Sequence, residues 1–184
     1  IAVSCLPAML IGLPLNDWLD KHFYNPTVVA LMLLLYGAGF LFVERYNRSR
    51  KPRVNSIAAL RWSDALLIGV FQVLALIPGT SRSGATILGG ILIGTSREVA
   101  AEYTFFLAVP VMFGASLLKI VKFGAFISGT ELGVLLVGMA VAFGVSILAI
   151  RFLMGYIRKH DFTAFGWYRI GLGLLVLLYF YVIR

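Results

Sequence analysis

The sequence has few of the residues that commonly carry catalysis or metal binding in soluble enzymes. It holds one cysteine, Cys5, and two histidines, His22 and His160, among 184 residues. A single cysteine excludes a disulfide framework, and its apolar neighbours favour a small buried residue. His22 has no histidine or cysteine partner near it, so it is interpreted as an interfacial residue rather than a metal ligand.

Charge is also scarce, and acidic charge most of all. There are 8 Asp and Glu against 16 Lys and Arg, and 60% of the residues are hydrophobic. Soluble domains are about 45–50% apolar, so this composition predicts a polytopic helical membrane protein. The net charge of +8 falls mostly in loops, where it reports membrane topology. Without an interleaved basic and aromatic pattern, we predict no nucleic-acid partner.

Apolar segments divide the chain into predicted membrane spans. The chain starts at Ile1 inside an apolar segment that lacks the features of a signal peptide, so we expect a missing N-terminal part. A linker is predicted at Asn16–Asn25 and a short outer loop at Lys122–Thr130. Spans are predicted at Ile1–Leu15 (the rest of a first span), Pro26–Val43, Val99–Val121, Glu131–Arg151 and Ala164–Val182, with Gly133, Gly138 and Gly144 as packing notches in the fourth.

Two loops carry half of the Lys and Arg residues, Glu44–Arg61 and Phe152–Phe162. The positive-inside rule predicts that both are cytoplasmic. Arg169, near the cytoplasmic end of the last span, is interpreted as a side chain that snorkels to the interface. Two interpretations of Glu102 stay open: it is a first-turn acid favoured by the helix dipole, or it pairs with Arg82 or Arg97.

Two apolar segments in the middle of the chain, Ala65–Ile77 and Ala85–Gly94, are too short to span a bilayer, which takes about 20 residues. A polar stretch, Pro78–Thr86, separates them. We therefore predict a re-entrant helical hairpin whose turn, Gly79–Ser83, is buried in protein or lines a wet cavity. The alternative is an ordinary cytoplasmic loop between two weakly hydrophobic spans, with Arg82 in solvent.

The residues of this turn suit an anion. A proline and a glycine end the first half-helix and allow a bend. The hydroxyl side chains that follow can cap the second half-helix, whose positive dipole end would face the turn. Arg82 adds a planar donor fork that suits phosphate. An arginine at membrane depth costs about 2.5–3.5 kcal/mol or more to insert, which indicates a functional role.

The stretch PGTSRSGAT, at 78–86, resembles the P-G-x-S-R-S-x-x-T signature of the undecaprenyl-diphosphate phosphatase family, the bacitracin-resistance proteins. The flanking GVFQVLAL and ILGGILIGTSREVAAEYTFFLAVPVMFGA and the early LPAMLIG are also similar to that family. The resemblance covers nearly the whole chain, taken as one integral membrane domain, 1–184. It implies roughly the C-terminal two thirds of an all-α inverted-repeat fold, in which this chain supplies one of two re-entrant hairpins, at about 65–94.

The resemblance also implies a function. The family hydrolyses undecaprenyl diphosphate to undecaprenyl phosphate and inorganic phosphate in the bacterial inner membrane. This recycles the lipid carrier for peptidoglycan synthesis and confers bacitracin resistance. Arg82 matches the family's phosphate-binding arginine, and Gln72 stands where the other half of the family fold has its first acid. We therefore expect Arg82 and Ser81 to be catalytic and Gly79, Thr80, Ser83, Thr86 and Gln72 to bind substrate.

In the family, the other half carries a Glu-x-x-x-Glu pair followed by Pro-x-Ser-Ser-x-Gly-His, which supplies acids, serine and histidine. That combined motif is absent here, so no nucleophile or base is assigned, and we expect residues 1–184 alone to bind substrate weakly without hydrolysing it. The resemblance also implies Mg²⁺ or Ca²⁺, although the chain shows no carboxylate cluster to hold one.

The expected partners are an isoprenoid lipid diphosphate, membrane lipids and, as a candidate assembly, a second copy in a homodimer. A different function stays open at this point. Broken helices whose N-termini face an anion at mid-membrane also occur in transporters, so a transporter or flippase for an anionic or lipid-phosphate substrate would use the same hairpin without hydrolysis.

Overall fold

Helices make up nearly all the regular structure of this chain. The computed structural model describes residues 1–123 and 129–183, and within these ranges it has an isolated bridge between Val54 and Thr95 but no strand. The predicted all-α fold is therefore confirmed. The helices are α1 (Ala2–Phe23), α2 (Pro26–Asn47), η1 (Ile57–Ala59), α3 (Trp62–Val73), η2 (Leu74–Leu76), α4 (Arg82–Leu92), α5 (Arg97–Phe123), α6 (Gly129–Ile157), α7 (Thr163–Leu178) and η3 (Tyr179–Ile183).

Four of these helical segments are long and apolar enough to cross a membrane: Pro26–Asn47, Arg97–Val121, Gly129–Ile157 and Thr163–Val182. They coincide with the last four predicted spans, so the chain is a multi-pass membrane protein. The predicted outer loop at Lys122–Thr130 falls mainly on residues 124–128, which lie outside the described residues.

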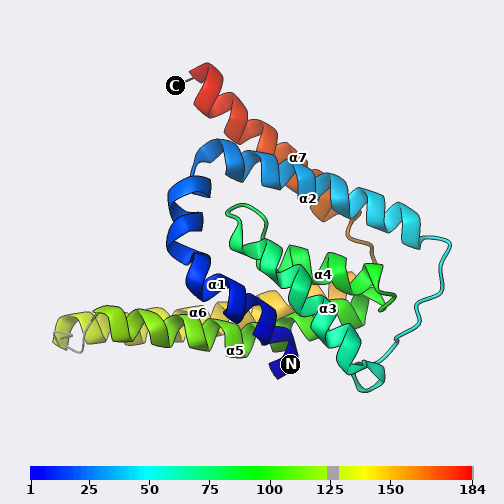
Figure 1. Cartoon of the computed structure of the whole chain (residues 1–184), viewed down its shortest axis with the longest axis horizontal. Coiled ribbons are helices and arrows are strands. Elements are labelled where there is room, and N and C mark those ends of the chain that lie inside the picture. Colours follow the sequence, from blue (N-terminus) through cyan, green and yellow to red (C-terminus); the bar gives the residue numbers. More distant parts are fainter. Residues whose placement is uncertain (124–128, 184) are drawn as a thin grey trace.

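The predicted linker at Asn16–Asn25 is wrong, because α1 continues through most of it and ends at Phe23. His22 stacks on Trp18, which lies one helical turn earlier, with ring centroids 4.7 Å apart. This contact favours continuation of the helix through the polar residues. The break comes at Asn25, whose side-chain oxygen accepts a hydrogen bond from the Val28 N–H at 2.9 Å and caps α2. Figure 1 shows that α1 is bent along its length.

The helices α2 and α7 lie side by side in Figure 1, and small residues bring their backbones together. A Cβ atom on Gly37 would lie 2.9 Å from the carbonyl oxygen of Gly166, and one on Gly173 would lie 3.0 Å from that of Ala30. Side chains larger than hydrogen would push the two helices apart. This close pairing fixes where α7 presents its residues to the hairpin.

The glycines of α6 behave differently from those of α2 and α7. No atom lies within 4 Å of a Cβ placed on Gly133, Gly138 or Gly144. In the described residues, therefore, these positions are not the helix contacts that the sequence predicted. The reason is that α6 runs along α5 with most of its own surface exposed.

Helix α4 lies at the centre of the molecule. All eight residues from Gly84 to Ile91 are buried, and the helix packs against α2, α3 and α5. One core cluster forms around it from several helices: Phe40, Val43, Ile87, Leu88, Ile91, Ala100, Ala101, Ile157 and Phe162. Because protein surrounds this 11-residue helix, it needs no stripe of large apolar side chains that faces lipid. Small residues instead allow the neighbouring helices to pack closely around it.

The structure forms the helical hairpin that the sequence predicted, with its two ends held together, and its re-entry into the membrane stays a prediction. Arg53 donates a side-chain hydrogen bond to Asp64 at the start of α3, with Nη2 and Oδ1 2.6 Å apart. Its backbone N–H donates to the carbonyl of Gly94, just after α4, at 2.8 Å. One residue thus ties the entry and the exit of the hairpin together, while the turn between α3 and α4 points into the molecule (Figure 1).

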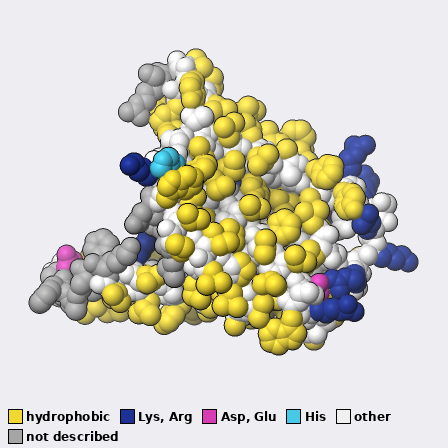
Figure 2. Space-filling view, in the orientation of Figure 1, with side chains coloured by type: hydrophobic (Ala, Val, Ile, Leu, Met, Phe, Trp, Pro, Cys, Tyr) yellow, Lys and Arg dark blue, Asp and Glu magenta, His cyan; other side chains and the backbone are white. Residues whose placement is uncertain are grey.

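The two basic loops meet at this same end. The N–H of Phe162 donates to Glu44 Oε1 at 3.1 Å, which joins the second basic loop to the end of α2. Arg97 forms a two-point ion pair with Glu44, so the alternative in which Glu102 pairs with Arg97 is not formed. Figure 2 shows Lys and Arg side chains gathered at one end of an otherwise largely hydrophobic surface.

The hairpin geometry makes a prediction for membrane topology. Single cysteines replacing Trp62, which is exposed, and Glu98, whose side chain is about half-exposed, should react with a membrane-impermeant thiol reagent from the same side of the membrane, in a Cys5→Ala background. A cysteine replacing Tyr24, at the opposite end of α2, should react from the other side. Labelling of positions 62 and 98 from opposite sides would mean that the segment crosses the bilayer.

Candidate active site

The turn between α3 and α4 is held in a backbone conformation that few residues adopt. Gly79 has φ +90°, and a Cβ atom there would lie 2.6 Å from the carbonyl oxygen of Val29 in α2. Ser81 has φ +64°, a left-handed value that is uncommon for a residue with a side chain. For a residue with a side chain, such as Ser81, a conformation of this kind costs about 1–3 kcal/mol, and such residues cluster at functional sites.

Ser81 is the N-cap of α4, which confirms the predicted start of the second half-helix. Its Oγ accepts a hydrogen bond from the N–H of Gly84 at 3.3 Å and lies 3.2 Å from the hydroxyl of Ser83. The N–H groups of Arg82 and Ser83, in the first turn, have no hydrogen-bond partner in the described part of the chain. The end of the helix therefore offers free donors and its positive dipole to the space beside the turn.

Arg82 begins α4 and is half-buried. Its Nη1 atom is buried and has no hydrogen-bond partner among the described residues. The ion pairs of the described residues, Arg53–Asp64, Arg97–Glu44 and Arg158–Glu98, do not include it. A pairing of Arg82 with Glu102 is thus not formed either. A half-buried guanidinium with unused donors is suited to an anion that comes from outside the described residues.

Arg169 also contacts the turn, which the sequence did not predict. Instead of snorkelling to the interface, its side chain is buried, with only 9% exposed. Its Nη2 donates to the carbonyl oxygens of Gly79 at 2.7 Å and Thr80 at 2.9 Å. The sequence held one signal for this buried position. Arg169 lies in the second turn of an apolar helix, about 9 Å from the start of α7, so its side chain has no short path to water.

Three other predicted binding residues lie buried around the turn. The Thr86 hydroxyl is directed at the carbonyls of Arg82 and Ser83, at 3.0 and 3.2 Å, and accepts a bond from Thr104 at 2.9 Å. This geometry ties the first turn of α4 to α5. The side chains of Thr80 and Gln72 are buried, and each has an oxygen without a partner in the described residues: Thr80 Oγ1 and Gln72 Oε1.

Gln72 faces α1 rather than the hydroxyls of the motif. Its Nε2 donates a long hydrogen bond, 3.5 Å, to the carbonyl of Ser4. The structure thus brings Gly79, Thr80, Ser81, Ser83 and Arg82 together in one turn. It gives no direct hydrogen bond between Gln72 and that group in the described residues.

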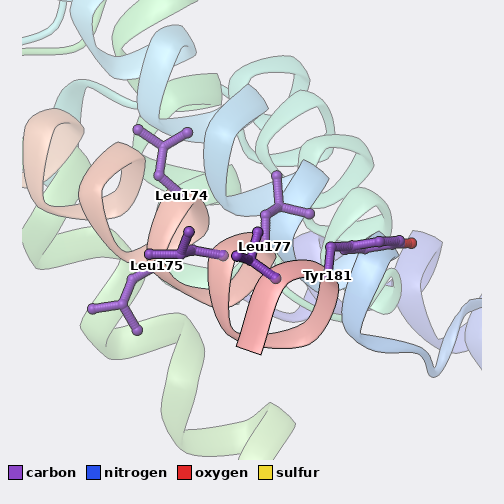
Figure 3. Close-up of a pocket in the computed structure, with 6 residues that line it drawn as sticks. Leu174, Leu175, Leu177 and Tyr181 are labelled. Carbon is purple, nitrogen blue, oxygen red and sulfur yellow. The ribbon is translucent and has the colours of Figure 1, made fainter. Parts of the chain in front are cut away.

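A separate hollow lies along the C-terminal end of α7 and has no polar lining residue other than a tyrosine. Figure 3 shows the side chains of Leu174, Leu175, Leu177 and Tyr181 around the last turns of this segment. Leu178 and Val182 complete its lining. Phosphate needs charged or N–H donors, so this hollow does not compete with the turn as an anion site.

The residues beside the turn do not fit the Mg²⁺ or Ca²⁺ that the resemblance implies. Both ions prefer oxygen ligands supplied largely by carboxylates. No group of three or more acidic, histidine or cysteine residues occurs in the part of the chain that the structure describes. Glu98 and Glu102 do have the Glu-x-x-x-Glu spacing, but Glu98 pairs with Arg158 and no Pro-x-Ser-Ser-x-Gly-His follows.

Comparison with known proteins agrees with the family resemblance that the motif at 78–86 indicated. The family model of the bacitracin resistance protein BacA matches residues 1–175. The chain belongs to this family. It is 60% identical, over all of its 184 residues, to an undecaprenyl-diphosphatase of Acetivibrio thermocellus. It is 58% identical to undecaprenyl-diphosphatases of Desulfitobacterium hafniense and Streptococcus mutans, over 98% and 97% of its length.

The chain is shorter than these relatives of the BacA family. It spans 68% of the Acetivibrio protein and 65% of each of the other two. The match covers both the hairpin and α7, so the turn and the arginine that binds its carbonyls lie inside the family region. The predicted family resemblance is confirmed.

The tight contact at Gly79 predicts a large effect of a single methyl group. Gly79→Ala should destabilise the protein in detergent by about 2 kcal/mol or more, because φ is positive and the Cβ would meet the backbone of Val29. Gly171→Ala, where a Cβ would meet no atom within 4 Å, is the matched control and should be neutral or stabilising. Equal thermal unfolding temperatures for the two variants would contradict the geometry of the turn.

Proposed function

We propose that this chain provides the phosphate-binding half of an undecaprenyl-diphosphate phosphatase in the bacterial inner membrane. The observation that carries the proposal is that two cationic side chains, Arg82 and Arg169, meet at one buried turn. Neither forms an ion pair with a carboxylate of the described residues. Buried charge without a counter-charge is costly, so an anionic ligand is the natural partner. The names of the BacA relatives identify that anion as a lipid diphosphate.

In the proposed reaction, the terminal phosphate sits against the N-terminus of α4. The guanidinium of Arg82 donates to two of its oxygens, and the free N–H groups of Arg82 and Ser83 donate to the same group. Phosphoryl transfer depends mainly on such positioning and on neutralising charge as the bond to the leaving oxygen breaks. Ser81 and Ser83 add hydroxyl donors at the same place, while Thr86 holds the first turn of the helix from beneath.

The attacking group and its base are not assigned to this chain. Without them the chain should bind a lipid diphosphate but hydrolyse little of it, because the nucleophile and its activating base act as one unit. A role for Mg²⁺ or Ca²⁺ remains a proposal that rests on the family resemblance only. No step of the proposed reaction uses a metal ion. The homodimer likewise stays a prediction.

The proposed orientation places the basic loops in the cytoplasm. Its support is that both loops meet at one end of the molecule, through the hydrogen bond from Phe162 to Glu44. The hairpin would then enter from the cytoplasmic side, because Arg53 ties both of its ends to the first loop. A transporter or flippase would use the same anion site, but the family relatives are named for hydrolysis, so that alternative is not favoured.

The proposal predicts that the geometry of Arg82 matters as well as its charge. In the longest natural reading frame that contains this chain, Arg82→Lys should lower kcat/KM for undecaprenyl or farnesyl diphosphate by about 100-fold, because an ammonium cannot make the bidentate contact. The measurement is release of inorganic phosphate in detergent. Arg61→Lys, at an exposed position in the first basic loop, is the control and should be near wild type.

Near-normal turnover by Arg82→Lys or Arg82→Ala would remove Arg82 from the site. A failure of the wild-type protein to release phosphate from any isoprenoid diphosphate would instead contradict the proposed reaction itself.

A further inference from the structure

Arg169 reaches the turn from a helix that is distant in sequence. It lies in α7, and its Nη2 donates to the carbonyls of Gly79 and Thr80, about ninety residues earlier. Its Nη1 would lie 3.1 Å from a Cβ on Gly84, so the guanidinium also touches the first turn of α4. Its Nε is buried and has no hydrogen-bond partner in the described residues.

A purely structural clip would not require a charge at this position. The guanidinium is nine-tenths buried and meets carbonyls rather than a carboxylate. Retaining an uncompensated cation inside a membrane protein is costly, and a neutral donor such as glutamine also has N–H groups for carbonyl oxygens. The charge therefore indicates a role that involves an anion.

The two hydrogen bonds fix the direction of the peptide groups in the turn. A trans peptide points its C=O and its N–H in opposite directions, and no cis peptide is present in the described residues. With the Thr80 carbonyl held toward Arg169, the N–H of Ser81 points away from it. The same arrangement keeps two carbonyl dipoles turned away from the space beside Arg82, where they would repel an anion.

We infer that Arg169 is a positioning residue for the anion-binding turn. It holds the carbonyls of Gly79 and Thr80 away from the bound phosphate and thereby directs the N–H of Ser81 toward it. The inference builds on the proposed phosphatase function and adds a residue outside the P-G-x-S-R-S-x-x-T motif. It assigns no direct contact between Arg169 and the reacting atoms.

The first test compares substitutions at the two arginines. Arg169→Lys keeps a charge with three donors for the two carbonyls, so it should stay within about 10-fold of wild type in kcat/KM. Arg169→Met removes both hydrogen bonds and should lose about 100-fold. Arg82→Lys should fall by about 100-fold, so lysine is tolerated at 169 and not at 82. Equal losses for lysine at both positions would overturn the positioning role.

A matched control separates positioning from loss of stability. Leu107→Val shortens a fully buried side chain of α5 that packs with Ala65, Ile68 and Tyr103 and belongs neither to the turn nor to α7. Its unfolding temperature should fall while its kcat/KM stays within about threefold of wild type. If Arg169→Met loses no more activity than Leu107→Val does, Arg169 has only a structural role and the inference is wrong.

A binding measurement makes the test independent of hydrolysis. Inorganic diphosphate should raise the unfolding temperature of the wild-type protein, because a ligand that binds the folded state stabilises it. Arg169→Met should lose that increase, and Leu107→Val should keep it. If the wild-type protein of the longest natural reading frame that contains this chain is stabilised but does not hydrolyse, the proposed reaction is refuted and this comparison stays intact. Full diphosphate stabilisation of Arg169→Met would refute the inference.

Discussion

The structure depends on holding positive charge at a buried turn without a carboxylate to balance it. Arg82 and Arg169 both meet the turn between α3 and α4, and no ion pair of the described residues includes either of them. In a membrane interior such an arrangement persists only if the surrounding backbone is well fixed. The left-handed conformation of Ser81 and the contact of Gly79 with Val29 are parts of that fixed backbone.

The rest of the fold supports this arrangement from two directions. Glycines allow α2 and α7 to pair closely, and each helix then contacts the turn at a different point. Val29 of α2 contacts the backbone at Gly79, and Arg169 of α7 binds the carbonyls of the turn. At the other end, Arg53 ties the beginning of α3 to the end of α4, so that the hairpin does not spread. Between them, α4 is buried on all sides, and only its first turn has free donors.

Local sequence was sufficient for the hairpin and insufficient for its supports. Segment length and the polar stretch between two apolar segments predicted re-entry, and the hydroxyl residues of the motif predicted a capped second half-helix. The part played by Arg169 depends on a contact between residues ninety positions apart, which no local pattern encodes. Likewise, Glu44 rather than the nearby Glu102 pairs with Arg97, because the fold brings the end of α2 to the start of α5. The continuation of α1 to Phe23 was missed because polar residues at a membrane interface are compatible with either a helix or a linker.

An experimental structure with a non-hydrolysable lipid diphosphate analogue, in which a methylene group replaces the bridging oxygen, would test the central claim most directly. The account predicts that the terminal phosphonate lies within hydrogen-bond distance of the Arg82 guanidinium and the Ser83 N–H, while Arg169 stays on the carbonyls of Gly79 and Thr80. A headgroup bound away from α4, with Arg82 turned toward lipid or a protein carboxylate, would contradict it.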